Sequence, residues 1–347
     1  MTICYFGIYN LDYSRSRVLI SGLGQNGINV LECNSREHGL RKYFDLVKKH
    51  WKIRKKYDLM LVGFPGYQTM VLARWLSSKP IIYDAFSSLY DSMIFDRKTA
   101  KPNGLKARYY WLLDWLSCRL ADRIIIDTQA HIDYFVKNFK IKPEKFIRVF
   151  VGTDDRIMKP QKKEKSNSIF LVCFYGSYIP LQGVKYILEA ARILQSENIR
   201  FNIIGSKIKE TFKKDALPNV DFIENAPYKN LSQYLGGADI CLGIFGDTDK
   251  ARRVIPNKVF DALALGQPVF TGASPAIKEL LVDGESALFC RLADSEDLAK
   301  KILELKNNAN LREKIAQNGY KLFSEKLTPR KIVADLFNNL KLDKYLF

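Results

Sequence analysis

One short segment, RRVIPNKVFDALALGQPVF at residues 252–270, combines cations with a predicted helix start. The cations around this start are Arg252, Arg253 and Lys258. Asn257 is the expected N-cap, and a helix N-terminus attracts anions through its free backbone N–H groups and positive dipole. Asp261, one turn further on, can accept hydrogen bonds from vicinal hydroxyls such as those of a ribose. The segment therefore predicts an anion-binding site with room for a ribose.

A second candidate phosphate loop is YGSYIPLQG, residues 175–183, which connects a predicted strand to the predicted helix VKYILEAARIL. Its candidate ligand residues are Gly176, Ser177, Gln182 and Gly183. Either loop alone is also typical of an ordinary strand-to-helix connection, whereas the two together favour binding of a phosphorylated ligand.

Other motifs favour structural roles. Asp247 and Asp249 in DTD resemble a metal clamp, but the neighbouring cations already neutralise phosphate, so we expect no metal and leave open a sugar contact by Asp247. GLGQNG closes a predicted helix and does not open one, so it indicates a helix C-cap and turn instead of a dinucleotide site. The three histidines, His38, His50 and His131, belong to no recognisable nucleophile and base set, which disfavours a histidine-based hydrolase.

Short β-rich runs alternate with helical patterns along the whole chain, which predicts parallel sheets joined by crossover helices. KPQKKEKSNS, residues 159–168, interrupts the alternation and is the expected linker between domains at 1–158 and 169–347. We expect two Rossmann-like α/β domains facing across a cleft, with ligands beyond the carboxyl ends of the strands and the last helix packing back on the first domain.

Composition limits the class of protein and its location. The 347 residues include 55 Lys and Arg against 37 Asp and Glu, so a net charge of +18 predicts a polyanionic partner. The six cysteines form no C-x-x-C pair, and no apolar run approaches the length needed to span a bilayer. With no recognisable signal peptide, we expect a cytoplasmic protein.

The second half of the chain resembles the GT-B glycosyltransferases of the retaining, family-4-like group. The resemblance rests on GVKYILEAARIL, RFNIIGS, YKNLSQYLGGADICLGIF and PNKVFDALALGQPVFTGASPAIKELLVDGESALFC, in that order over about 150 residues. YFGIYNLDYSRSRVLISGLGQNGINVLEC, ADRIIIDTQAHIDYF and VFVGTD in the first half fit more loosely. The resemblance implies a nucleotide sugar bound as co-substrate by the second domain, an acceptor bound by the first, and metal-independent transfer without a cofactor.

The resemblance also implies roles for individual residues. Asp261 stands where the family has a ribose-binding Glu, whereas Arg253 replaces the usual sugar-side acid, and Ser177 and Gln182 replace the loop's phosphate-binding cations. Asp84, after a predicted strand, is the expected acceptor-orienting residue. The expected catalytic residues are Lys258, Arg253 and Asp84, and the expected donor-binding residues are Gly176, Ser177, Gln182, Gly183, Ala226, Arg252, Asn257, Lys258 and Asp261.

The leading hypothesis is a hexosyltransferase that moves a sugar from a nucleotide-diphosphate sugar to a lipid-linked or polysaccharide acceptor, with retention of configuration. One alternative is a nucleotide-sugar epimerase of the same fold, for which no acid and base pair is recognisable. The other is a nucleic-acid-binding protein, which the charge alone suggests and no reading motif supports, so we expect no nucleic-acid partner.

The segment LRKYFDLVKKHWKIRKKY, residues 40–57, predicts a basic amphipathic helix. Its expected apolar stripe is Leu40, Tyr43, Phe44, Val47 and Trp51. Such a stripe either packs on its own domain or, with the exposed lysines, binds an anionic membrane surface reversibly. We therefore expect a peripheral protein on the cytoplasmic face of a membrane.

Overall fold

The computed structural model describes residues 1–161, 169–212 and 217–341, and the chain divides into two compact units. Unit 1 comprises Met1–Asp154 and Thr328–Phe347, and unit 2 comprises Asp155–Leu327. Each unit holds one six-stranded parallel sheet with helices packed on it, which confirms the predicted fold class of two parallel-sheet α/β units. Most of the expected linker, residues 162–168, lies outside the described residues.

The sheet of unit 1 has the strand order β2-β1-β3-β4-β5-β6. Its strands are β1 Thr2–Gly7, β2 Asn29–Asn34, β3 Leu59–Val62, β4 Ile81–Asp84, β5 Arg123–Ile126 and β6 Phe146–Arg148. The central strands β3 and β4 are buried along their whole length, which explains why LMLV in β3 and IIY in β4, before Asp84, do not alternate with polar residues.

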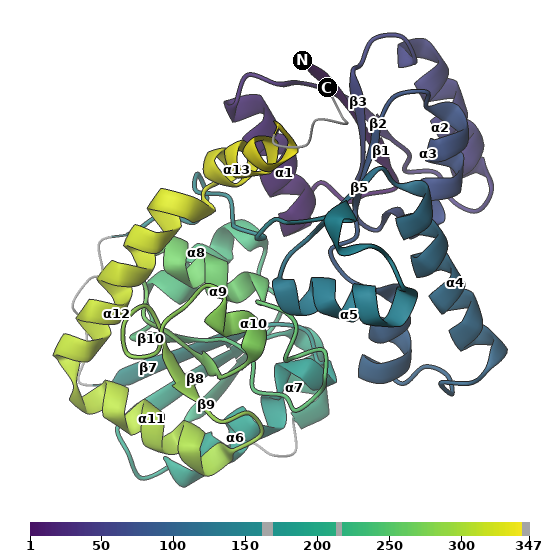
Figure 1. Cartoon of the computed structure of the whole chain (residues 1–347). Coiled ribbons are helices and arrows are strands. Elements are labelled where there is room, and N and C mark those ends of the chain that lie inside the picture. The colour runs from purple at the N-terminus through teal and green to yellow at the C-terminus, as the bar shows by residue number, and fades with distance from the viewer. Residues whose placement is uncertain (162–168, 213–216, 342–347) are drawn as a thin grey trace. The chain divides into compact units, whose positions relative to one another are not determined.

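Helices cover both faces of this sheet (Figure 1). Helices α2 to α5 share one core with the sheet, through residues such as Leu46, Met70, Cys118 and Phe135. Helix α1 covers the other face together with α13, which returns from the far end of the chain. The helices of unit 1 are α1 Ser14–Gln25, α2 Arg41–Ile53, α3 Met70–Leu76, α4 Leu105–Leu120, α5 Gln129–Phe139 and α13 Pro329–Lys341, with shorter turns η1 Gly66–Gln68, η2 Asp91–Asp96 and η3 Pro143–Lys145.

The sheet of unit 2 has the order β12-β11-β10-β7-β8-β9. Its strands are β7 Phe170–Tyr175, β8 Ile199–Ile204, β9 Val220–Ile223, β10 Ile240–Leu242, β11 Val269–Gly272 and β12 Leu288–Cys290. Its helices are α6 Val184–Ile193, α7 Ser206–Phe212, α8 Tyr228–Gly236, α9 Asn257–Ala264, α10 Pro275–Lys278, α11 Ser295–Asn307 and α12 Ala309–Leu322, with turns η4 Pro180–Gln182 and η6 Phe323–Leu327. Helices α6, α7 and α11 share a core on one face, while α8 packs beside α9.

Two helices of unit 2 are short: α10 is a single turn of 4 residues, and α7 has 7 residues. Within the described residues, no helix combines the length and apolar character needed to cross a bilayer.

Candidate functional site

The topology of unit 2 places a switch point beside β7. The chain runs from β7 to β8 and β9 on one side, then crosses to β10, β11 and β12 on the other. Ligands of open parallel sheets bind beyond the carboxyl ends of the strands at such a point, because the two flanking loops diverge there. The loop after β7, residues 176–183, and the loop after β10, residues 243–256, therefore frame the candidate site.

These two loops are held together by their backbones. The Phe245 N–H donates to the Gln182 carbonyl at 3.2 Å, and the Gly246 N–H donates to the Leu181 carbonyl at 3.2 Å. Gly183 adopts φ +68°, and a Cβ there would lie 2.4 Å from the Gly246 nitrogen. Only glycine fits both this left-handed conformation and this close approach, so the joint between the loops depends on it.

Lys258, on the first turn of α9, reaches back into the first loop. Its Nζ donates to Gln182 Oε1 and lies 3.6 Å from the centre of the Phe174 ring. A Cβ on Gly176 would come within 3.0 Å of this ammonium, so Lys258 lies directly against the Gly176 backbone. The sequence predicts that cations meet a phosphate here, and the structure brings Gly176, Gln182 and Lys258 into one cluster.

The charge on Lys258 is electrostatically uncompensated. The residue is only 5% exposed, and no carboxylate in the described part of the chain forms an ion pair with it. Burial lowers the pKa of the Lys258 ammonium well below its usual range, because removal from water disfavours the charged form. A bound anion would supply the missing partner.

Asp261 lies one turn further along α9 and is 1% exposed. The Tyr175 hydroxyl donates to its Oδ2, and the Tyr228 hydroxyl donates to its Oδ1 at 2.9 Å. Burial, together with the Asp261 charge, raises the pKa of Tyr175 well above its usual range. Asp261 thus accepts hydrogen bonds from two tyrosines in a buried network. Of these two, Tyr175 also lines the candidate ligand cavity.

A cavity of about 480 Å³ opens next to Tyr175, at the carboxyl ends of β7, β8 and β9. It is lined by Tyr175, Gly176, Ser177, Ile204, Ser206, Lys207, Asn225, Ala226 and Leu231. Its volume is in the range typical of small-molecule sites. Three expected donor residues, Gly176, Ser177 and Ala226, therefore line one cavity. The others do not line it: Gln182, Gly183, Arg252, Asn257, Lys258 and Asp261.

The start of α9 differs from the expectation. Pro256 and not Asn257 occupies the N-cap position, and no side chain caps the helix. Asn257 is already helical, so its side chain cannot close the first turn. Arg252 is exposed and Arg253 is half-buried in the turn that precedes the helix. The described residues contain no group of three or more His, Cys, Asp or Glu side chains able to hold a metal ion, and both Asp247 and Asp249 are exposed.

Asp84 in unit 1 is fully buried at the carboxyl end of β4. Arg15 Nε lies 3.1 Å from both carboxylate oxygens, and its Nη1 donates to the Val149 carbonyl at 2.7 Å. Burial raises the pKa of Asp84, and the Arg15 charge opposes that shift. This geometry is that of a structural ion pair, and a role for Asp84 in orienting an acceptor stays a prediction.

Unit 1 carries further polar and aromatic groups at the same sheet edge. Asp127 directly follows β5, and its carboxylate lies 2.8 Å from Nδ1 of the buried His131. The rings of Tyr13, Phe64 and Phe86 form a mutually contacting, half-buried trio, with centroids 5.0 to 5.9 Å apart. Neither arrangement was identified from the sequence, although the i, i+4 spacing of Asp127 and His131 would have indicated the pairing.

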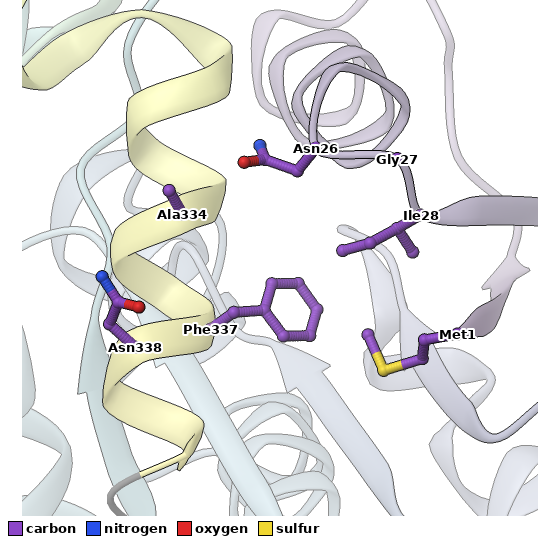
Figure 2. Close-up of a pocket in the computed structure, with 7 residues that line it drawn as sticks. All are labelled: Met1, Asn26, Gly27, Ile28, Ala334, Phe337 and Asn338. Carbon is purple, nitrogen blue, oxygen red and sulfur yellow. The ribbon is translucent and has the colours of Figure 1, made fainter.

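A larger cavity, of about 610 Å³, lies elsewhere in unit 1 and is not the candidate site. Figure 2 shows it between α13 and the segment after α1, with Phe337, Ile28 and Met1 around it. It lies at the amino ends of β1 and β2, the edge opposite to the one where parallel sheets bind ligands, and none of the described residues that line it carries a charged side chain.

Comparison with known proteins identifies the class of domain. Residues 154–322 match the sequence profile of the family described as Glycosyl transferases group 1, so this segment is a group 1 glycosyltransferase domain. The whole fold is similar to that of HepE from Anabaena, solved with UDP and glucose. The TM-score is 0.74 at 15% identity, and the match covers 99% of this chain and 100% of that one. The fold is therefore GT-B-like.

Two curated relatives match a smaller part of this chain. An uncharacterized glycosyltransferase of Methanocaldococcus jannaschii is 24% identical over 243 residues, or 67% of this chain and 62% of that protein. The capsular polysaccharide biosynthesis glycosyltransferase CapM of Staphylococcus aureus is 24% identical over 197 residues, or 53% of this chain and 49% of that protein. The matched segments thus span less than two thirds of either relative.

Proposed function

We propose that the protein transfers a sugar from a nucleotide-diphosphate sugar to a hydroxyl acceptor. The observation that carries this proposal is the buried, uncompensated Lys258 ammonium against the Gly176 loop, beside a cavity of about 480 Å³ in a group 1 glycosyltransferase domain. The diphosphate would lie at Lys258 and the uncapped start of α9, where it supplies the negative charge that this site lacks.

The nucleoside part would occupy the cavity at the ends of β7 to β9. Tyr175 and Ala226 would contact the base or ribose, and Asp261 would act through its bond to Tyr175 or accept directly from the ribose after that phenol moves. UDP is the first nucleotide to test, because HepE was solved with it.

During transfer, the bond between the anomeric carbon and the diphosphate breaks while the acceptor hydroxyl attacks that carbon and gives its proton to an oxygen of the leaving diphosphate. Negative charge develops on the leaving diphosphate, and Lys258, Arg253 and the N–H groups of α9 would stabilise it. These groups make a metal redundant, so we propose metal-independent hexosyl transfer, with retention of configuration as the family resemblance implies.

For the acceptor we propose a lipid-linked glycan or a growing polysaccharide on the cytoplasmic face, bound by unit 1. The similarity to CapM supports polysaccharide biosynthesis. The carboxyl edge of the unit 1 sheet, with the Tyr13, Phe64 and Phe86 rings, offers apolar surfaces of the kind on which sugar rings stack.

A two-stage experiment tests this function. The melting temperature of the full chain is measured with UDP, GDP, ADP and dTDP and their sugar conjugates, since a ligand of the native state raises it. The stabilising conjugate is then incubated with candidate acceptors, and products are identified by mass spectrometry. We expect one nucleotide to stabilise the chain and its sugar to appear on an acceptor. Stabilisation by none, or interconversion of the sugar without transfer, would reject the proposal.

A further inference from the structure

Helix α2 carries apolar side chains on two different faces. None of the five residues of the expected stripe, Leu40, Tyr43, Phe44, Val47 and Trp51, is buried in the core; three are exposed and two are half-buried. Leu46 and His50 are buried, and Tyr43 and Val47 are half-buried. On the outer face, Leu40 is 75%, Phe44 75% and Trp51 64% exposed. Packing on the unit's own sheet therefore explains only the inner residues.

The neighbouring helices continue this outer apolar surface. Helix α3 contacts both α2 and α4, and all three helices pack on the same face of the unit 1 sheet (Figure 1). Val71 and Trp75 of α3 are 53% and 77% exposed, and Leu105 and Tyr109 of α4 are 85% and 55% exposed. The spacings of three and four residues place each set on the side of its helix that points away from the sheet. Leu112, three residues after Tyr109, is 48% exposed. The docking face is defined as Leu40, Phe44, Trp51, Val71, Trp75, Leu105, Tyr109 and Leu112.

Exposed cations lie on or next to two of the helices that carry the docking face. Six of them on and after α2 are Lys48, Lys49, Lys52, Arg54, Lys55 and Lys56, and three on or before α4 are Lys101, Lys106 and Arg108. Lys49 pairs with Asp45, and the Arg54 guanidinium lies 3.4 Å from the centre of the Trp51 ring. Lys48, Lys52, Lys55 and Lys56 form no ion pair with the described residues. Their charge is thus available to an anionic partner.

From these contacts we propose that the docking face inserts shallowly into an anionic lipid bilayer. Exposed leucine, phenylalanine and tryptophan side chains gain from leaving water, while long lysines extend past them to the headgroups. Tryptophan and tyrosine favour the interfacial depth, and an apolar face with a cationic rim supplies the two signals that stable peripheral binding requires. A nucleic acid would bind the cations but leave the exposed leucines in water. The exposed apolar residues therefore favour a lipid bilayer over a nucleic acid as the partner.

The proposal goes beyond the sugar transfer and is independent of the donor site, since all residues involved belong to unit 1. It places binding to a membrane on the same unit for which we propose acceptor binding.

The test uses flotation of the full chain with vesicles of phosphatidylcholine alone or mixed with phosphatidylglycerol. We expect binding only to the mixed vesicles at low salt, and release at about 0.5 M salt because screening shortens the Debye length. Replacing Lys48, Lys52, Lys55 and Lys56 with Glu should reduce partitioning at least about tenfold. The matched control replaces Lys278, Lys300, Lys321 and Lys326 of unit 2, which are exposed and change the net charge equally.

Insertion is distinguished from adsorption by a second pair of variants. Phe44→Ser with Trp75→Ser should lower partitioning about tenfold, whereas Ile193→Ser with Val282→Ser, on exposed positions of unit 2, should not. Brominated lipid should quench the tryptophan fluorescence of the natural chain but not that of a Trp51→Phe, Trp75→Phe variant.

Three outcomes would overturn the proposal: equal binding to neutral vesicles, no binding at low salt, or binding that survives both the Ser and the Glu variants. If the Glu variant alone lost vesicle binding, the binding would be electrostatic adsorption, and insertion of the docking face would be rejected. Stabilisation by nucleotide, measured in every variant, should be unchanged, which keeps a failure here separate from a failure of the donor site.

Discussion

Replacing Lys258 with Met is the most direct perturbation of the candidate donor site. Methionine keeps an unbranched apolar chain against Phe174 but removes the charge that Gln182 Oε1 contacts. A hydrogen bond to a charged group contributes roughly 1.5 to 3 kcal/mol. We therefore expect the Kd of the stabilising nucleoside diphosphate to rise roughly tenfold to a hundredfold in calorimetry. Lys301→Met is the control, since Lys301 pairs with Glu304 on α11 outside the site.

Proton uptake on nucleotide binding gives a second test, in which the natural chain is compared with Lys258→Met. Because burial lowers the pKa of Lys258 in the empty protein, a bound diphosphate should raise that pKa and cause proton uptake. The binding enthalpy of the natural chain should then depend on the ionisation enthalpy of the buffer, and its affinity should fall as pH rises through the pKa of the empty site. Neither effect should occur in Lys258→Met.

Lys258→Met should weaken nucleotide binding without lowering the stability of the nucleotide-free protein. The pKa of Lys258 is lower in the folded protein than in the unfolded chain. The protein therefore loses stability as pH falls from the ordinary lysine pKa toward the pKa in the folded state, because the unfolded chain binds the proton more readily. Without nucleotide, Lys258→Met should therefore be at least as stable as the natural chain at neutral pH. Unchanged nucleotide affinity in a folded variant, or buffer-independent enthalpy in the natural chain, would refute this account of the site.

Four further predictions concern the rest of the molecule. Arg15→Met leaves Asp84 buried without its partner and should cost about 3 to 5 kcal/mol of unfolding free energy in urea; a loss below about 1 kcal/mol would contradict the pairing. Burial raises the pKa of Asp114 to about 6, so the natural chain should lose stability relative to Asp114→Asn as pH rises from about 4 to 6, and parallel curves would argue against it. Gly183→Ala should weaken both folding and nucleotide binding, because its Cβ meets the opposite loop; a normal melting temperature would exclude that clash. Transfer should continue in EDTA, and a complete loss restored by manganese would revive a metal at Asp247 and Asp249.

The sequence determined the fold more completely than the site. Runs such as LMLV and IIY, the second followed by Asp84, are separated by helical patterns and predict parallel strands, because helices cover both faces of such a sheet. The order of elements then predicts where the ligand edge lies. The same pattern could not show that α2 has a second apolar face, since Phe44 and Tyr43 are equally compatible with a core until the packing partners are known.

The site depends on contacts between residues far apart in the chain. Lys258 and Gly176 each read as part of a phosphate loop, but their mutual contact needs the β7 and α9 geometry. Tyr175 and Tyr228 were missed because a tyrosine at a strand end or helix start gives no pattern that predicts its hydrogen-bond partner. Asn257 as N-cap was wrong because Pro256 already has the extended backbone that this position needs.

The return of α13 to unit 1 has a consequence for biosynthesis. Val333, Leu336 and Phe337 of α13 belong to the same buried core as Val18 and Leu19 of α1. A ribosome therefore makes all of unit 2 before it makes the helix that completes one face of the unit 1 sheet. Until then the apolar side of α1 remains uncovered, so the first unit to be synthesised is the second to finish folding, and ribosome-bound chains that end before residue 328 should be the species that chaperones hold.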